Sequence, residues 1–142
     1  PLSNALIAAV ASHHRLLFVH PFRDGNGRVA RLALDAALLA LGLDAKGAWT
    51  PTRGFARSRA AYYDALSAAD AERWHDAEGR GDRSVRGLVH WCRYVLGVMK
   101  EQADFVATLL SPGVLRRRLA AAILNGRGMH HRVASAEYRL VA

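Results

Sequence analysis

The sequence predicts an all-α protein in which five to six helices surround one central apolar helix. Alanine is abundant and β-branched residues are few, a composition that favours helix over strand. Apolar residues recur every three to four positions through most of the chain, as they do in amphipathic helices. With 142 residues, 51% of them hydrophobic, the chain is long enough to bury one core.

The first helix is expected over residues 2–19, where Leu6, Val10 and other apolar residues share one face. Pro21 sets its end, because a proline disfavours helical geometry in the residue before it, here His20.

The second helix is expected over residues 29–41. Apart from Arg31 and Asp35 it is apolar on all sides, which predicts that it is the buried central helix. Arg31 and Asp35 are four positions apart, so an ion pair between them is a purely structural role for this arginine. Gly42 and the residues after it end the helix.

The remaining elements follow the same criteria of spacing, caps and breakers. They are a loop at 43–54, a third helix at 55–71, a loop at 75–82, a fourth helix at 84–110 and a fifth helix at 112–124 that stops at Asn125-Gly126. For residues 129–142 a strand, a helix and a frayed tail all stay open. We expect one domain over residues 1–110, followed by a C-terminal helix and tail over 111–142 that leads to any further module.

The most informative segment is residues 20–31, which read His20-Pro21-Phe22-Arg23-Asp24-Gly25-Asn26-Gly27-Arg28-Val29-Ala30-Arg31. Gly25 and Gly27 can take positive φ, and Asn26 tolerates it better than most residues. Such a turn points successive backbone N–H groups into one concavity that binds anions. The helix that follows adds its own unpaired N–H groups and the positive end of its dipole.

The side chains around this turn suit phosphate chemistry. Arg28 and Arg31 share a face of the first helical turn, and the arginine fork matches phosphate oxygens. Asp24 lies just outside the turn, where a carboxylate would hold Mg²⁺ against bound phosphates. His20 is the group of the segment suited to general-base work near neutral pH.

The segment also resembles the signature of the Fic family, His-Pro-Phe-x-Asp/Glu-Gly-Asn-Gly-Arg-x-x-Arg, at every fixed position. The resemblance implies a Fic-type helical bundle and the transfer of AMP from ATP to a hydroxyl side chain of a target protein. It implies that His20 is the base, that Asp24 is the Mg²⁺ ligand and that Phe22 is a packing residue that anchors the loop. It also implies an anion site for the triphosphate that consists of Gly25, Asn26, Gly27, Arg28 and Arg31. Related Doc-type kinases degrade the Gly-Asn-Gly portion, which is intact here and therefore favours nucleotidyl transfer.

Three other features bear on the resemblance. Tyr62 and Tyr63 lie where the family often has tyrosines beside the nucleotide, with core packing as the alternative. The family's inhibitory element, Ser/Thr-x-x-x-Glu-Gly/Asn, is missing, so an inhibitory segment or an antitoxin-like partner would have to come from outside this chain. Only 19 residues precede His20 and they read as helix, so we expect the family's upstream β-hairpin flap to be missing from this catalytic core or to lie before it.

Two alternative functions stay open. The first is another transfer at the same site, by a kinase or by a UMP or phosphocholine transferase. The second is a non-enzymatic regulator that binds DNA through Arg116, Arg117 and Arg118, although three consecutive arginines more often form a solvated helix face. The net charge of +8 suits anionic partners but also follows from an arginine-rich composition.

The remaining expectations are negative. A single cysteine, Cys92, excludes an internal disulfide and favours the cytoplasm. No apolar run reaches the roughly 18 residues of a membrane span, so we expect no membrane contact. The pairs His13-His14 and His130-His131 have no carboxylate at ligand spacing, so we expect no metal there.

Overall fold

A computed structural model of the chain describes residues 1–43, 47–73 and 81–137, and the side chains of these ranges up to residue 125. Within these ranges it has six helices and no strand, so the all-α prediction is confirmed. The helices are α1 (Leu2–Val19), α2 (Asn26–Ala40), α3 (Pro51–Arg57), α4 (Arg59–Asp70), α5 (Val85–Leu109) and α6 (Pro112–Glu137). The chain divides into two compact units, Pro1–Asp104 and Phe105–Ala142, and the predicted site lies in the first.

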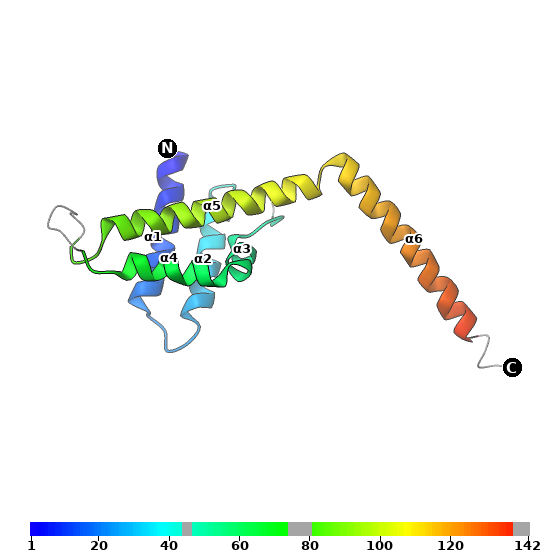
Figure 1. Cartoon of the computed structure of the whole chain (residues 1–142), viewed down its shortest axis with the longest axis horizontal. Coiled ribbons are helices and arrows are strands. Elements are labelled where there is room, and N and C mark those ends of the chain that lie inside the picture. The colour runs from blue at the N-terminus through cyan, green and yellow to red at the C-terminus, as the bar shows by residue number, and fades with distance from the viewer. Residues whose placement is uncertain (44–46, 74–80, 138–142) are drawn as a thin grey trace. The chain divides into compact units, whose positions relative to one another are not determined.

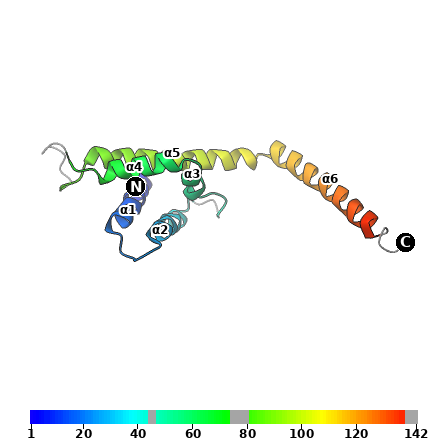
Figure 2. The ribbon, with the colours of Figure 1, turned by 60° about the horizontal axis from the view of Figure 1, so that its bottom comes forward.

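In the first unit α1 packs against α2, and α4 runs beside α5 (Figures 1 and 2). The indole of Trp91 on α5 is fully buried and its Nε1–H donates to the Val10 carbonyl of α1 at 3.1 Å. The core around it consists of Val10, Leu34, Leu38, Phe55, Tyr62, Ala65, Ala69, Trp91, Val95, Val98 and Met99. These residues come from α1, α2, α3, α4 and α5, so one apolar core holds the site's supporting helices together.

Helix α1 has the bounds that the sequence predicts. Its 18 residues have a mean hydropathy of 1.2, so by length and composition α1 could cross a membrane, and the expectation that no run is long enough is wrong. Only 17% of this window is buried, through Val10, His13 and His14, and both a mostly buried core helix and a signal sequence near the N-terminus pass the same test. The expected absence of membrane contact stays a prediction.

Helix α2 differs from its prediction in two respects. It begins at Asn26 rather than at residue 29, and it is not buried on all sides. Leu32 and Leu39 are 69% and 62% exposed. Its buried residues recur every four positions, at Asn26, Ala30, Leu34 and Leu38, so a single stripe faces α1 and the core. The high apolar content of α2 predicted more burial than the helix has, because alanine and leucine also occupy its exposed face.

The segment predicted as one helix at 55–71 consists of two. Thr50 caps α3 by accepting a hydrogen bond from the Thr52 N–H at 3.2 Å, with Pro51 in the first turn. Ser58 separates α3 from α4 with φ −125° and ψ 53°. Gly54 explains the placement of α3, because a Cβ there would collide with Val98 of α5. The close contact between α3 and α5 therefore requires a residue without a side chain at position 54.

Backbone contacts join the two ends of the connection from α4 to α5. The Arg73 N–H donates to the Asp82 carbonyl at 3.0 Å, and Glu72 and Arg83 form an isolated β-bridge. Most of the predicted 75–82 loop, and Trp74, lie outside the described residues. A Cβ at Gly87 would collide with the Ala68 carbonyl, so α5 starts in direct contact with α4.

Helix α6, in the second unit, runs from Pro112 to Glu137. The prediction that it stops at Asn125-Gly126 is therefore wrong. Both residues are poor helix formers rather than absolute breakers, at up to about 1 kcal/mol each, and the helix-forming residues around them carry α6 past this point. Residues 138–142 of the predicted tail lie outside the described residues.

Candidate active site

His20 follows α1 in the left-handed conformation, with φ 50° and ψ 55°. Its backbone N–H donates to the Leu16 carbonyl at 3.2 Å and closes the helix. The side-chain Nδ1 lies 3.2 Å from the Leu17 carbonyl oxygen. A carbonyl only accepts, so in the neutral ring Nδ1 carries the proton and Nε2 of the exposed side chain has the lone pair. In this neutral tautomer Nε2 is the nitrogen that can accept a proton.

The loop between α1 and α2 is tied by the side chain of Asn26, which is only 3% exposed. Its Nδ2–H donates to the Phe22 carbonyl at 2.6 Å, and its Oδ1 accepts from the Phe22 N–H at 3.0 Å. The ring of Phe22 is 49% exposed, so the main chain of this residue anchors the loop and its ring does not.

The N-terminus of α2 presents the expected backbone N–H groups in a different conformation from the one predicted. Gly25 has φ 82° and precedes the helix, whereas Gly27 lies inside it, so only one of the two glycines takes positive φ. The first helical bond runs from the Val29 N–H to the Gly25 carbonyl at 2.9 Å. The N–H groups of Asn26, Gly27 and Arg28 precede this bond and are the donors that a helix N-terminus offers to an anion.

Asp24 is engaged on both oxygens. Its Oδ1 accepts from the Gly25 N–H at 2.6 Å, and its Oδ2 accepts from Arg28 Nη2 at 3.1 Å. The Asp24 and Arg28 side chains are 91% and 74% exposed, so their ion pair contributes little and can rearrange. Among the described residues no group of three or more His, Cys, Asp or Glu could hold a metal ion. A lone exposed carboxylate fits Mg²⁺ that takes most of its ligands from substrate phosphates and water.

Arg31 is partly buried beside the first turn of α2. A Cβ at Gly27 would lie 3.2 Å from its Nη1, so the missing side chain leaves room for the guanidinium. The Arg31 guanidinium also lies near the Tyr62 hydroxyl of α4, and both side chains line one cavity. The alternative ion pair with Asp35 is not formed, since Asp35 Oδ1 accepts from Thr50 Oγ1 at 2.8 Å. Arg31 therefore shares a cavity with residues of α4 and has no ion pair with Asp35 of its own helix among the described residues.

A cavity of about 350 Å³ opens at Arg31. Its lining consists of Arg31, Thr52, Phe55, Ala56, Arg59, Tyr62 and Tyr63. Tyr63 is 52% exposed and its ring meets the guanidinium of Arg59 at 5.6 Å from the centroid. Burial raises the pKa of Tyr62 to about 12, so Tyr62 keeps its proton.

The cavity brings together one predicted motif residue and both predicted tyrosines, and it adds Thr52 and Arg59, which the sequence reasoning missed. The sequence contained one signal for Arg59, because it lies four positions before Tyr63 on one helix and this spacing brings the two side chains together.

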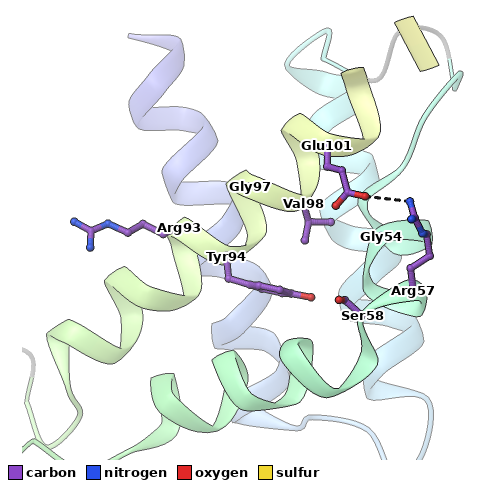
Figure 3. A pocket seen from close by; sticks show the side chains of 8 residues that line it. All are labelled: Gly54, Arg57, Ser58, Arg93, Tyr94, Gly97, Val98 and Glu101. Carbon is purple, nitrogen blue, oxygen red and sulfur yellow. Dashed lines mark hydrogen bonds and ion pairs between the residues drawn. The ribbon is translucent and has the colours of Figure 1, made fainter. Parts of the chain in front are cut away.

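Two other cavities lie outside the motif's anion site. Figure 3 shows the first, about 400 Å³, between α3, the start of α4 and α5, with Arg57 and Glu101 paired at 3.0 Å across its rim. Inside it the Tyr94 hydroxyl is buried and has no hydrogen-bond partner among the described residues. The second, about 560 Å³, is an apolar groove between α1 and α2.

The residues singled out for other roles lie elsewhere. His13 and His14 are buried, each 2% exposed, and both hydrogen-bond within the first unit. The side chains of Arg116, Arg117 and Arg118 are exposed on α6 of the second unit. The side chains of His130 and His131 lie outside the described residues.

Comparison with known proteins supports the resemblance. Residues 2–38 match the Fic/DOC family. The protein adenylyltransferase Fic of Nematostella vectensis is 53% identical over 34 residues, which are 24% of this chain and 8% of the relative. The protein adenylyltransferases fic-1 of Caenorhabditis briggsae and Caenorhabditis elegans are each 39% identical over 70 residues, 49% of this chain and 12% of the relative.

The chain thus spans about a tenth of the length of the curated relatives it matches. No solved structure matches it significantly. The similarity is short but covers the whole of the segment from His20 to Arg31.

Proposed function

We propose that this chain, through the segment that matches the Fic/DOC family, transfers AMP from Mg²⁺-bound ATP to a hydroxyl side chain of a target protein. The observation that carries the proposal is the loop from His20 to Gly25, which Asn26 ties to Phe22. This loop brings into one short segment the His20 imidazole, whose Nε2 has a lone pair in the neutral ring, and the three first N–H groups of α2, which have no hydrogen-bond partner among the described residues.

The phosphates of ATP bind at the N-terminus of α2 in this proposal. Arg31 extends from α2 into the neighbouring cavity, and Arg28 turns from Asp24 to the phosphates because its surface ion pair is weak. Asp24 is the residue that would hold Mg²⁺, which supplies charge neutralisation at the phosphates. The half-exposed ring of Tyr63 offers an aromatic surface for the base of the nucleotide.

The chemistry then follows from the histidine. His20 Nε2 accepts the proton of the target hydroxyl, because Nδ1 already donates to the Leu17 carbonyl. The resulting oxygen nucleophile bonds to the α-phosphorus of ATP, and the bond from this phosphorus to the bridging oxygen breaks. Pyrophosphate leaves with the charge that Arg28 and Arg31 neutralise.

A transfer assay with two isotopic labels tests the proposal. The chain is incubated with candidate target proteins, Mg²⁺ and ATP that carries the label on either the α- or the γ-phosphate. We expect α-label on a serine, threonine or tyrosine, and an intact mass that increases by one AMP. Transfer of γ-label alone would assign a kinase instead, and a UMP or phosphocholine adduct from the corresponding donor would assign those transfers.

The base has a matched control in this assay. His20→Ala should lower transfer by about 10²–10⁴-fold, the contribution of a positioned general base. His90→Ala removes an exposed histidine of α5 outside the motif and should leave transfer unchanged. Equal rates for the two variants would remove His20 from the mechanism.

A further inference from the structure

His13 is a buried polar residue that the proposed mechanism does not use. Its ring is 2% exposed and lies between two aromatic rings, with centroids 5.5 Å from Trp91 and 5.9 Å from Phe55. Both stacks are nearly parallel, at 11° and 20°. A phenylalanine would satisfy such packing, so the nitrogen atoms of His13 need a separate explanation.

The hydrogen bonds of His13 fix its tautomer. Nδ1 lies 2.8 Å from the Ala30 carbonyl oxygen, which only accepts, so Nδ1 carries the proton. Nε2 lies 3.3 Å from the Tyr62 hydroxyl and, in the neutral ring, is an acceptor. The Tyr62 O–H therefore donates to His13.

The direction of this hydrogen bond determines whether the Tyr62 hydroxyl presents its proton or a lone pair to Arg31. Arg31 and Tyr62 line the same cavity, and a guanidinium only donates, so a hydrogen bond between them needs a lone pair of the Tyr62 oxygen. With its proton given to His13, the Tyr62 hydroxyl turns a lone pair to Arg31. The observed donations run from Tyr62 to His13 and from His13 to the carbonyl of Ala30, the residue before Arg31, and they leave the Tyr62 oxygen able to accept from Arg31.

The surroundings of His13 preserve these hydrogen-bond directions. Burial lowers the pKa of His13, so the ring stays neutral and Nε2 remains an acceptor. The groups that act on it are Arg31 and Asp35 of α2 and His14 of α1. A proton on Nε2 would turn it from an acceptor into a donor and reverse the Tyr62 hydroxyl.

We propose that His13 is a positioning residue for nucleotide binding, because through the Tyr62 hydroxyl it holds the guanidinium of Arg31 at the mouth of the 350 Å³ cavity. The proposal rests on the proposed function, in which Arg31 binds phosphate. It goes beyond that function, because in it a buried histidine on α1 sets the position of an arginine on α2 by way of α4. No contact between His13 and the nucleotide is required.

A double-mutant cycle tests the coupling. Tyr62→Phe keeps the ring and its stacking on Phe55, 4.9 Å between centroids, and removes only the hydroxyl. In calorimetric titration with Mg²⁺-ATP we expect its Kd to rise about tenfold, the typical effect of a lost hydrogen bond to a charged group. In an Arg31→Ala background the same change should have no further effect. Equal losses in both backgrounds would overturn the proposal.

Two variants complete the test. His13→Asn keeps a donor for the Ala30 carbonyl and lacks an acceptor at the Nε2 position, so it should reproduce the Tyr62→Phe result. The matched control is Tyr94→Phe, which removes a buried hydroxyl from the same aromatic cluster, and it should leave ATP affinity unchanged. A loss in the control equal to that of Tyr62→Phe would show general damage to the core and overturn the proposal.

A readout without nucleotide separates this proposal from the proposed function. Nitrogen NMR of the wild type should show the Nδ1–H tautomer of His13, and the slowly exchanging guanidinium signal of Arg31 should be lost in Tyr62→Phe and His13→Asn. If the wild type fails to bind ATP while these signals behave as expected, the proposed function fails and the positioning of Arg31 stands. An Nε2–H tautomer, or an Arg31 signal unchanged in both variants, would overturn the positioning role whatever binds.

Discussion

Replacing Asn26 with alanine tests whether one amide side chain holds the loop that carries the base. The Asn26 amide is 3% exposed and makes two hydrogen bonds to the main chain of Phe22, at 2.6 and 3.0 Å. Alanine removes both partners from Phe22, whose N–H and carbonyl then have to find water. The substitution adds no steric conflict, because it only shortens a side chain at the start of α2.

The magnitude follows from the two bonds. Each contributes about 0.5–1.5 kcal/mol net, so the free energy of unfolding should fall by about 1–3 kcal/mol. The loop between His20 and Gly25 should also lose its fixed geometry, so the rate of AMP transfer should fall further than the loss of folded protein explains.

Urea denaturation followed by circular dichroism gives the stability, and transfer measured at low temperature, where both proteins are folded, gives the activity. Asn4→Ala is the matched control, because Asn4 is an exposed asparagine of α1 and its replacement should leave both quantities nearly unchanged. A loss of less than about 0.5 kcal/mol for Asn26→Ala, with normal transfer, would refute the reasoning that this side chain holds the loop.

Three further predictions concern single groups. Asp24→Ala should weaken ATP binding in Mg²⁺ and leave the weaker Mg²⁺-free binding unchanged, and a Mg²⁺ titration of nucleotide affinity that matches the wild type would remove Asp24 from the site. Gly27→Ala should displace Arg31, whose Nη1 would lie 3.2 Å from the new methyl group, and lower ATP affinity several-fold in calorimetry. The same change should stabilise α2 by up to about 1 kcal/mol in thermal melts, and a parallel loss of affinity and stability would contradict this account. Because burial lowers the pKa of His13 from 6.5, the unfolded chain takes up a proton below pH 6.5 that the folded chain does not. Folding stability is therefore complete above pH 6.5 and should fall below it by up to about 1.4 kcal/mol per pH unit, and an equal slope in His13→Asn would exclude His13 as the cause.

Local signals in the sequence were sufficient where one residue determines the backbone. Helix α1 ends where Pro21 requires it, and His20 leaves the helix as expected. The start of α3 also had a readable signal, since Thr50-Pro51 is a typical cap followed by a first-turn proline, yet the prediction began the helix four residues later.

Tertiary contacts explain what the sequence did not reveal. The close packing of Gly54 on Val98 joins residues that are 44 positions apart and belong to different helices. The early start of α2 depends on the side chain of Asn26, which could equally have served a loop. Such contacts have no periodicity and no local signature, so they appear only once the helices are packed.

Some residues of the candidate site were likewise predictable from the local sequence, and others were not. The motif placed His20, Asp24 and the N-terminus of α2 in one segment because they are neighbours in sequence. Arg59 and Tyr62 belong to a helix about thirty residues further on, and a sequence pattern alone does not show that they line one cavity with Arg31. The assignments of the site residues to base, metal ligand and phosphate contacts stay predictions.

The two glycines of the motif differ in the handedness that they require. At position 25, φ is 82°, the mirror image of what an L-residue prefers, so a D-amino acid would be relaxed there and an L-amino acid strained. At position 27 the backbone is that of a right-handed helix, which suits an L-residue, and only the guanidinium of Arg31 stands in the place of a side chain. A chemically synthesised chain with D-alanine at position 25 would keep the turn, whereas D-alanine at position 27 would disturb the helix. Position 25 therefore needs glycine because its backbone is achiral, whereas position 27 needs glycine because it has no Cβ.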